Sequence, residues 1–394
     1  MTKAKRRDAG RPAAREPKLA IHRLLAAGPP SPGAIDRFLA AHRFPLVEET
    51  SVTFVFFGEA DAVLLQHFIY GLPTSQPFGR VGSSKLWFLV LDLPPGSRLQ
   101  YKLNVERGGE GRWILDPRNE ERAYDPFGAN SVCHTAGAER PAWTRPDPEA
   151  RHGTFEEIAV RSAAFGERRK ARIYLPARYR TSRSYPLLVV HDGSDYQRFS
   201  DLDTVLDNLI HRLEVAPLVV ALVDAADRLE EYPDNPRHAR LLKEELLPAL
   251  EQRYSLLGVP AGRGLMGASF GAVAALSAAW RYQGVWDRLL LQSGSFAFTD
   301  IGDHDRGPLF DPVVRFVNRL REAPGRPAEK VFVSCGVYER LIYENRSLVP
   351  RLQAAGMKVR FVEARDGHSW ANWRDRLRAG LSWLFPGPLW MVYE

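Results

Sequence analysis

The strongest chemical pattern in the sequence is a serine flanked by two glycines, Gly267-Ala268-Ser269-Phe270-Gly271. A short apolar run typical of a strand, Gly264–Met266, precedes this G-x-S-x-G pattern, and an alanine-rich run typical of a helix follows it. A strand, a tight turn and a helix together form a nucleophile elbow, in which the serine occupies a strained turn and the glycines let neighbouring backbone pass closely. We therefore predict that Ser269 is the nucleophile of an acyl-transfer reaction.

A serine hydroxyl is a weak nucleophile, so the site also needs a base within hydrogen-bonding reach. In folds that carry this elbow, the acid and then the histidine follow the serine along the chain. His368 is the predicted general base, because it follows the strand-like run Lys358–Glu363 and precedes the last predicted helix. His304 also follows the serine, but its charged neighbours are typical of an exposed loop.

The third member of such a site is a carboxylate that orients the histidine. Glu339 is the predicted acid, because its loop follows the strand-like run Lys330–Ser334 and so lies at the carboxyl end of that strand. Glu344 is the alternative, although it could instead start the next helix. Asp366 is only two residues from His368, which is too close along the chain to orient it.

An oxyanion hole requires two backbone N–H groups that converge on the acyl oxygen. Phe270, which follows the nucleophile, is expected to supply one of them. The other is expected from Gly193 or Ser194, in the loop after the strand-like run Pro186–His191. His191 and Asp192 are potential metal ligands, but no second cluster supports a metal site. We therefore predict neither a metal nor a cofactor.

The elements around these residues alternate between strands and helices. Strands are expected at Ala171–Leu175, Pro186–His191, Leu218–Val223, Gly264–Met266, Arg288–Gln292, Lys330–Ser334 and Lys358–Glu363. Helices are expected at Thr204–Leu213, Arg237–Arg253, Phe270–Trp280, Val313–Glu322, Asn345–Ala355 and Ala371–Leu384. This alternation predicts an α/β fold, with a mostly parallel sheet covered by helices on both faces and the chemistry at the carboxyl ends of the strands.

The first part of the chain has a different pattern. Two short helices are expected, at Leu19–Ala27 and after the capping residue Ser31, and then short strands at Val52–Phe57, Ala62–Leu65, Leu86–Leu91, Gln100–Val105 and Trp113–Asp116. Closely spaced strands predict a small β-sandwich. We expect a tail and short helix over residues 1–30, the sandwich with an irregular linker at Arg118–Asp147 over 31–147, and an α/β-hydrolase domain over 148–394.

Composition limits the classes of partner. The 394 residues carry a formal net charge of +7, of which +5 lies in residues 1–18, so the remaining chain is nearly neutral. We interpret this tail as a solvated arm and expect no nucleic-acid partner. The apolar runs are too short to span a membrane. Only two cysteines, Cys133 and Cys335, are present, which is typical of a cytoplasmic protein.

Several motifs, taken in order, resemble those of the enterochelin (ferric siderophore) esterases, within the putative-esterase (esterase D-like) superfamily of α/β-hydrolases. In the first half these are the strand Val52–Phe56, Tyr101-Lys102-Leu103, Leu115-Asp116-Pro117 and Pro126–Ser131. In the second half they are His191-Asp192-Gly193, Glu244–Pro248, the serine motif, Gln292–Ser295 and Asp366-Gly367-His368. The resemblance implies hydrolysis of a catecholate trilactone, with or without iron, by Ser269, His368 and Glu339. Two departures are the alanine before the serine and the loop Ser334–Glu339, which differs around the acid.

We expect a serine ester hydrolase of the siderophore-esterase type that acts on a small-molecule ester. The alternative is a feruloyl, acetyl or general carboxylesterase whose first domain resembles a carbohydrate-binding module. In that case Trp87, Trp113 and Tyr101 would bind sugar, although their pattern favours packing in the core. A third hypothesis is a binding protein that keeps the hydrolase fold as a scaffold. The oligomeric state stays open, and a monomer is compatible with the sequence.

Overall fold

A computed structural model describes residues 19–300 and 303–388, and its contacts divide the chain into two compact units. The first unit contains residues 19–66, Ser75–Pro95 and Lys102–Glu121. The second contains His67–Thr74, Gly96–Tyr101 and the chain from Arg122 onward. The predicted basic tail, residues 1–18, lies outside the described residues. The domain limits expected from the sequence stay a prediction.

The first unit is built from antiparallel strands, as the spacing of its short apolar runs predicts. One sheet has the order β1-β2-β6-β5, and β3 pairs with both β4 and β7, while β7 also pairs with β8. The bounds are β1 Leu46–Glu48, β2 Ser51–Phe57, β3 Ala62–Gln66, β4 Ser75–Pro77, β5 Gly79–Arg80, β6 Leu86–Asp92, β7 Arg98–Arg107 and β8 Glu110–Ile114. Of β7, only the part from Lys102 onward belongs to this unit.

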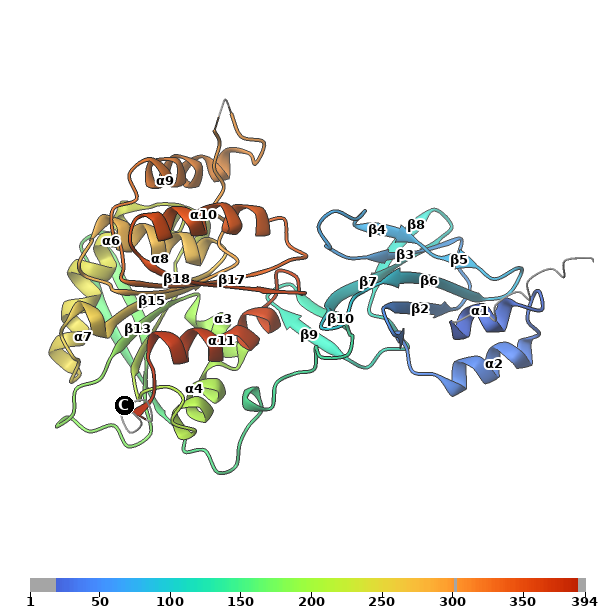
Figure 1. The fold of residues 1–394 in the computed structure, drawn as a ribbon, viewed down its shortest axis with the longest axis horizontal. Coiled ribbons are helices and arrows are strands. Elements are labelled where there is room, and N and C mark those ends of the chain that lie inside the picture. The colour runs from blue at the N-terminus through green and yellow to red at the C-terminus, as the bar shows by residue number, and fades with distance from the viewer. Residues whose placement is uncertain (1–18, 301–302, 389–394) are drawn as a thin grey trace, which may run out of the picture. The chain divides into compact units, whose positions relative to one another are not determined.

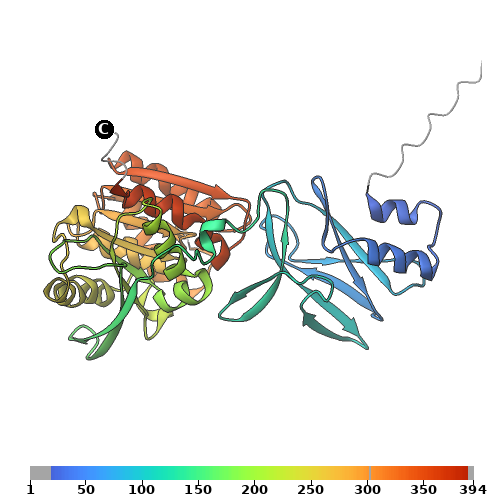
Figure 2. The ribbon, with the colours of Figure 1, turned by 90° about the horizontal axis from the view of Figure 1, so that it is seen from below.

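Two helices, α1 (Ala20–Leu25) and α2 (Pro32–Ala41), pack on the sheet of β2 and β6 (Figures 1 and 2). Ser31 caps α2 by accepting a hydrogen bond from the Ala34 N–H at 3.3 Å, and Pro32 occupies the first helical position, where its missing N–H costs no bond. The apolar face of α2 is buried against the sheet, together with Ile21 of α1. Both predicted helices are confirmed.

The aromatic residues considered for a sugar platform do not share one environment. The side chains of Trp87 and Tyr101 are buried, as the predicted packing role requires. Trp113, on β8, is 56% exposed, so the expectation of core packing is wrong for this residue.

The second unit has an eight-stranded sheet with the order β11-β12-β14-β13-β15-β16-β17-β18. The pairs β11–β12 and β12–β14 are antiparallel, and all the others are parallel. The bounds are β11 Thr154–Ser162, β12 Glu167–Leu175, β13 Leu187–His191, β14 Val219–Val223, β15 Arg263–Ala268, β16 Arg288–Gln292, β17 Lys330–Gly336 and β18 Lys358–Ala364. The predicted, mostly parallel α/β fold is confirmed.

Helices cover both faces of this sheet (Figure 1). On one face, α3 (Gly193–Ser200), α4 (Leu202–His211) and α11 (Trp370–Leu384) pack on strand residues such as Leu188 and Val190. The opposite face is covered by α8 (Phe270–Arg281), α9 (Asp311–Glu322), α10 (Ile342–Ala354) and the segment from α6 to α7. Because side chains alternate along a strand, Leu187 and Val189 face this second group. None of the described helices is both long and apolar enough to cross a membrane.

Three predicted elements need correction. The stretch expected to be an irregular linker contains β9 (Arg122–Asp125) and β10 (Gly128–His134), and β10 pairs with residues 98–101 of β7. The loop expected after β13 begins the helix α3. The helix expected over Arg237–Arg253 is interrupted: α6 (Pro236–Arg240) and α7 (Leu247–Arg253) flank a π-helical segment, Leu241–Leu246. The remaining short elements are η1 Ala142–Thr144, α5 Arg228–Glu231, η3 Pro260–Gly262 and η4 Pro308–Phe310.

Candidate active site

Ser269 lies between the end of β15 and the start of α8, in the strained turn that the G-x-S-x-G pattern predicts. Its φ of 56° and ψ of −122° lie outside the regions that non-glycine residues ordinarily occupy. The turn is fixed from both sides, because the Ser269 N–H donates to Gln292 O at 3.0 Å and Ser269 O accepts from the Ser295 N–H at 3.3 Å. Such an outlier, held by its surroundings, is typical of a site where strain serves function.

Both glycines of the motif lie at close approaches, Gly267 to backbone and Gly271 to side chains. A Cβ on Gly267 would clash with the backbone of Gly271, the second residue of α8. A Cβ on Gly271 would lie 3.2 Å from Asp192 Oδ2 and 3.3 Å from His191 Cβ. The motif therefore brings the turn of Ser269 against the end of β13, where the second oxyanion donor was predicted.

His368 and Glu339 are in direct contact. Nδ1 of His368 lies 2.6 Å from Glu339 Oε2, so the Nδ1–H donates to the carboxylate and Nε2 is left as the acceptor. Glu339 is buried, whereas the side chain of His368 is 40% exposed and its ring packs edge-on against Trp373, with 4.9 Å between the centroids. This is the arrangement in which a carboxylate fixes the tautomer of a general base.

The second oxygen of Glu339 is held by other donors. Oε1 accepts hydrogen bonds from Ser293 Oγ at 2.7 Å and from the Gly336 N–H at 2.8 Å. Ser293 Oγ in turn accepts from Trp373 Nε1 at 3.0 Å. The carboxylate therefore has one oxygen committed to the protein and the other directed at His368.

The alternative residues have other partners. Glu344 pairs with Arg306 and is buried, and burial raises the pKa of its carboxyl group to about 7. Asp366 pairs with Arg98, and His304 Nε2 lies 3.0 Å from Asp311 Oδ1. Of the carboxylates considered, Glu339 is the one that the structure places beside His368.

The Ser269 hydroxyl lies 3.2 Å from Ser295 Oγ. Within residues 19–300 and 303–388, no hydrogen bond joins it to His368. Catalytic hydrogen bonds often tighten only when the substrate binds. The pairing of nucleophile and base stays a prediction.

The two predicted oxyanion donors begin helices. Phe270 is the first residue of α8 and Gly193 is the first residue of α3, so neither N–H has a partner within its own helix. The N–H of Ser194 instead donates to Asp224 Oδ1 at 3.1 Å, and its hydroxyl also bonds to Asp224. This bond favours Gly193 over Ser194 as the second donor.

A cation lies beside the elbow. Arg228 Nε contacts both oxygens of Asp192, at 2.9 and 3.0 Å, and its Nη2 lies 3.4 Å from Ala268 O. Its guanidinium is 5.9 Å from the centre of the Phe270 ring, and its side chain is 37% exposed. Burial lowers the pKa of Arg228, and the neighbouring Asp192 raises it. The net shift is upward, so the guanidinium stays charged. A partly exposed arginine, whose charge is paired with Asp192, therefore lies next to Ser269.

His191, which was considered as a metal ligand, is instead part of the support behind the elbow. Its Nδ1–H donates to Met266 O at 2.9 Å, and its Nε2 lies 3.1 Å from Nε2 of His238. Burial, with the neighbouring His238, lowers the pKa of His191 to about 3, so the ring is neutral. A neutral ring whose Nδ1 is a donor must accept at Nε2, so His238 is the donor of the pair.

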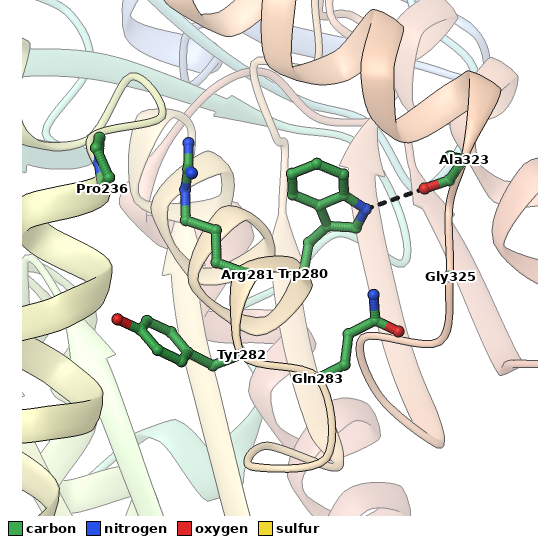
Figure 3. Close-up of a pocket in the computed structure, with 7 residues that line it drawn as sticks. All are labelled: Pro236, Trp280, Arg281, Tyr282, Gln283, Ala323 and Gly325. Atoms are coloured by element: carbon green, nitrogen blue, oxygen red, sulfur yellow. Dashed lines mark hydrogen bonds between the residues drawn. The ribbon is translucent and has the colours of Figure 1, made fainter.

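A surface pocket lies at the other end of α8 (Figure 3). Trp280 and Arg281, the last residues of the helix, line it, and Trp280 Nε1 donates to Ala323 O at 3.1 Å. Ser269 precedes the first residue of the same helix. Since a helix of this length rises by about 18 Å, the pocket is distinct from the candidate active site.

No role was predicted from the sequence for Ser295, Ser293, Trp373 or Arg98. Ser293 and Ser295 directly follow β16, so small polar residues at the carboxyl end of a parallel strand were an available signal. The role of Arg98 could not be predicted from its neighbours in the sequence, which indicate only a strand. Its partner Asp366 lies 268 positions away.

The fold and the strained serine define an α/β-hydrolase with a nucleophile elbow. Residues 162–384 match the model of the family described as "Putative esterase", and the chain belongs to this family. The match covers β12 to α11 and therefore includes all the predicted site residues.

Two iron(III) enterobactin esterases are similar in sequence to part of this chain. An iron(III) enterobactin esterase of Dickeya dadantii is 27% identical over 290 residues, which cover 70% of this chain and 65% of that protein. Another, from Escherichia coli strain K12, is 26% identical over 248 residues, which cover 61% of this chain and 59% of that protein. The chain thus matches less than two thirds of the length of each.

A similar fold is present in a crystal structure of ferric enterobactin esterase from Salmonella typhimurium. The TM-score is 0.70 at 21% identity, over 85% of this chain and 93% of that chain. The resemblance to enterochelin esterases and the predicted fold class are confirmed.

Proposed function

We propose that the protein hydrolyses carboxylic esters with Ser269 as nucleophile, His368 as general base and Glu339 as the orienting acid. The N–H groups of Phe270 and Gly193 form the oxyanion hole. The observation that carries this proposal is the 2.6 Å contact between His368 Nδ1 and the buried Glu339, in the same unit as a serine strained into an elbow.

The reaction proceeds through an acyl-enzyme. Ser269 Oγ bonds to the ester carbonyl carbon while its proton passes to His368 Nε2, and the resulting oxyanion accepts the two N–H bonds. The carbon–oxygen bond to the alcohol then breaks, and His368 protonates the leaving oxygen. A water molecule, deprotonated by His368, attacks the acyl carbon, and the released Ser269 oxygen takes the proton back. Throughout, Glu339 accepts the Nδ1–H and stabilises the imidazolium.

The proposed substrate is a catecholate siderophore, a trilactone with or without bound iron; the iron belongs to the substrate. Two observations support it: the names of the relatives, and the partly exposed guanidinium of Arg228, which pairs with Asp192 beside Phe270 and suits an aromatic acyl group. Cys133 and Cys335 are buried and form no disulfide, which fits a reducing compartment, so we place the reaction in the cytoplasm.

A substrate panel tests this proposal. It contains a catecholate trilactone with and without iron, feruloyl and acetylated sugars, and p-nitrophenyl esters, with products identified by mass spectrometry for the wild type and for Ser269→Ala. We expect the highest kcat/KM on the trilactone and no turnover by the variant. A higher kcat/KM on feruloyl or acetylated sugars would support the alternative esterase, and turnover by Ser269→Ala would refute the mechanism.

A further inference from the structure

A buried ion pair lies next to the loop that carries His368. Arg98 belongs to the segment Gly96–Tyr101 of the second unit and is only 4% exposed. Its Nη2 donates to Asp366 Oδ2, and its Nη1 donates to Asp375 Oδ2 at 2.6 Å. Its backbone N–H also donates to Arg365 O at 2.9 Å. Arg98 therefore holds both the backbone and the carboxylate of the segment that leads to His368.

The two carboxylates depend on Arg98 to different degrees. Asp375 also accepts a hydrogen bond from Arg374 Nε at 2.9 Å, so it keeps a cation if Arg98 is removed. Within the described residues, Arg98 is the cation that contacts Asp366. Burial raises the pKa of Asp366, and Arg98 opposes that shift. Without Arg98, a buried carboxylate two residues from His368 would lose its counter-charge, which favours rearrangement of the loop.

The same segment also reaches the loop that carries Glu339. Ser97 Oγ lies 2.6 Å from the hydroxyl of Tyr338, the residue before Glu339. The Tyr338 N–H donates to Asp366 O at 3.1 Å, so the two loops are also bonded to each other. Two adjacent residues, Ser97 just before β7 and Arg98 at its start, thus contact the two loops whose side chains meet at 2.6 Å.

We propose that Arg98 is a positioning residue for the candidate active site: through Asp366 it holds the His368 loop where the ring meets Glu339, and the neighbouring Ser97 holds the Glu339 loop. The catalytic consequence rests on the proposed function. The structural consequence, loss of the hydrogen bond between His368 and Glu339, does not rest on it. The two are measured separately.

The main variant is Arg98→Met, which keeps most of the side-chain volume and removes the charge and the donors. We expect kcat on a p-nitrophenyl ester, per active site titrated with a fluorophosphonate, to fall about 10- to 100-fold, since a misplaced catalytic group costs factors of this size. KM should change less than about twofold, because Arg98 is buried and out of reach of substrate. Arg98→Lys, which retains the charge, should recover part of kcat.

The readout that is independent of catalysis is the downfield proton resonance of the hydrogen bond between His368 Nδ1 and Glu339, assigned by its absence in His368→Ala. We expect Arg98→Met to broaden or abolish it and Arg98→Lys to retain it. The matched control is Arg281→Met, which removes another arginine paired with a buried aspartate, Asp234, at the far end of α8. The melting temperature of Arg281→Met is compared with that of Arg98→Met, and the kcat and the resonance of Arg281→Met should stay unchanged.

Three results would overturn the positioning role. They are an unchanged resonance in Arg98→Met, an equal loss of kcat in Arg281→Met, and no difference between Arg98→Met and Arg98→Lys. Failure of the proposed function has a different signature, which is turnover by Ser269→Ala while the resonance still responds to Arg98→Met.

Discussion

The carboxylate of Glu339 offers the sharpest test of the site, because its two oxygens have different partners. In Glu339→Gln the amide must place its carbonyl oxygen where Oε1 lies, since Ser293 Oγ and the Gly336 N–H both donate there. The amide NH2 then faces His368 Nδ1, at the position where Oε2 accepts at 2.6 Å in the native protein. Two donors cannot face each other, so the ring must accept at Nδ1 and carry its proton on Nε2.

A ring protonated at Nε2 cannot take the proton of Ser269. The loss of the correct tautomer costs about 10³- to 10⁴-fold in kcat in sites of this type, which is roughly 4 to 5.5 kcal/mol of transition-state stabilisation. The fold should persist, since every donor to Oε1 keeps an acceptor. KM should change little, because the effect lies in the chemical step.

The assay is kcat and KM on a p-nitrophenyl ester for the wild type, Glu339→Gln and the matched control Glu344→Gln, with circular dichroism to verify the fold. Glu344→Gln should retain kcat within about threefold, because Glu344 pairs with Arg306 rather than with His368. Nearly full activity in Glu339→Gln together with collapse in Glu344→Gln would refute the reasoning and make Glu344 the acid.

Four further outcomes are expected. Ser269→Ala and His368→Ala should each lower kcat by about 10⁵- to 10⁶-fold in steady-state kinetics, and the double variant should be little worse, since the two residues act as a unit. A loss of kcat in the double variant equal to the product of the two single losses would contradict the pairing. Because burial raises the pKa of Glu344 from 4.5 to about 7, the folded protein retains a proton that the unfolded chain releases, so the free energy of unfolding should fall by about 3 kcal/mol as the pH rises through this window. Glu344→Gln should flatten that decline in urea titrations, and a wild-type stability that is constant between pH 5 and 7 would contradict it. Gly271→Val should lose activity and stability, because its side chain would meet Asp192 and His191; a normal melting temperature with full kcat would contradict the close approach. Deletion of residues 1–18 should leave kcat/KM on a neutral ester unchanged but lower kcat/KM on an anionic catecholate at low salt, because the net charge of +5 attracts anions. Equal kcat/KM values of the full-length and truncated proteins on the anionic substrate would exclude this steering.

The sequence predicts those parts of the fold and the site that depend on residues close together along the chain. The elbow could be predicted because its strand, glycines and helix lie within about twenty residues, and the structure has them in β15 and α8. Strands β13, β14 and β16 are buried apolar runs, and the predicted positions of β13 to β18 agree with the structure to within a few residues.

The elements that the sequence did not predict either consist mainly of polar residues or depend on contacts between distant parts of the chain. Strand β11 reads Thr-Phe-Glu-Glu-Ile-Ala-Val-Arg-Ser and lies at the sheet edge, so only a minority of its side chains are buried. Helix α3 follows Asp192, whose φ is 53°, and its residues are mostly polar, a pattern typical of a loop. The ion pair of Arg98 with Asp366 joins residues separated by 268 positions, a contact that only the folded chain creates.

The most direct test of the central claim, an acyl-enzyme on Ser269, is intact-protein and peptide mass spectrometry after reaction with a fluorophosphonate. The account predicts one adduct per chain, on the peptide that contains Ser269, together with complete loss of ester hydrolysis and no adduct in Ser269→Ala. Labelling of another residue, or hydrolysis that persists in the fully labelled protein, would contradict it.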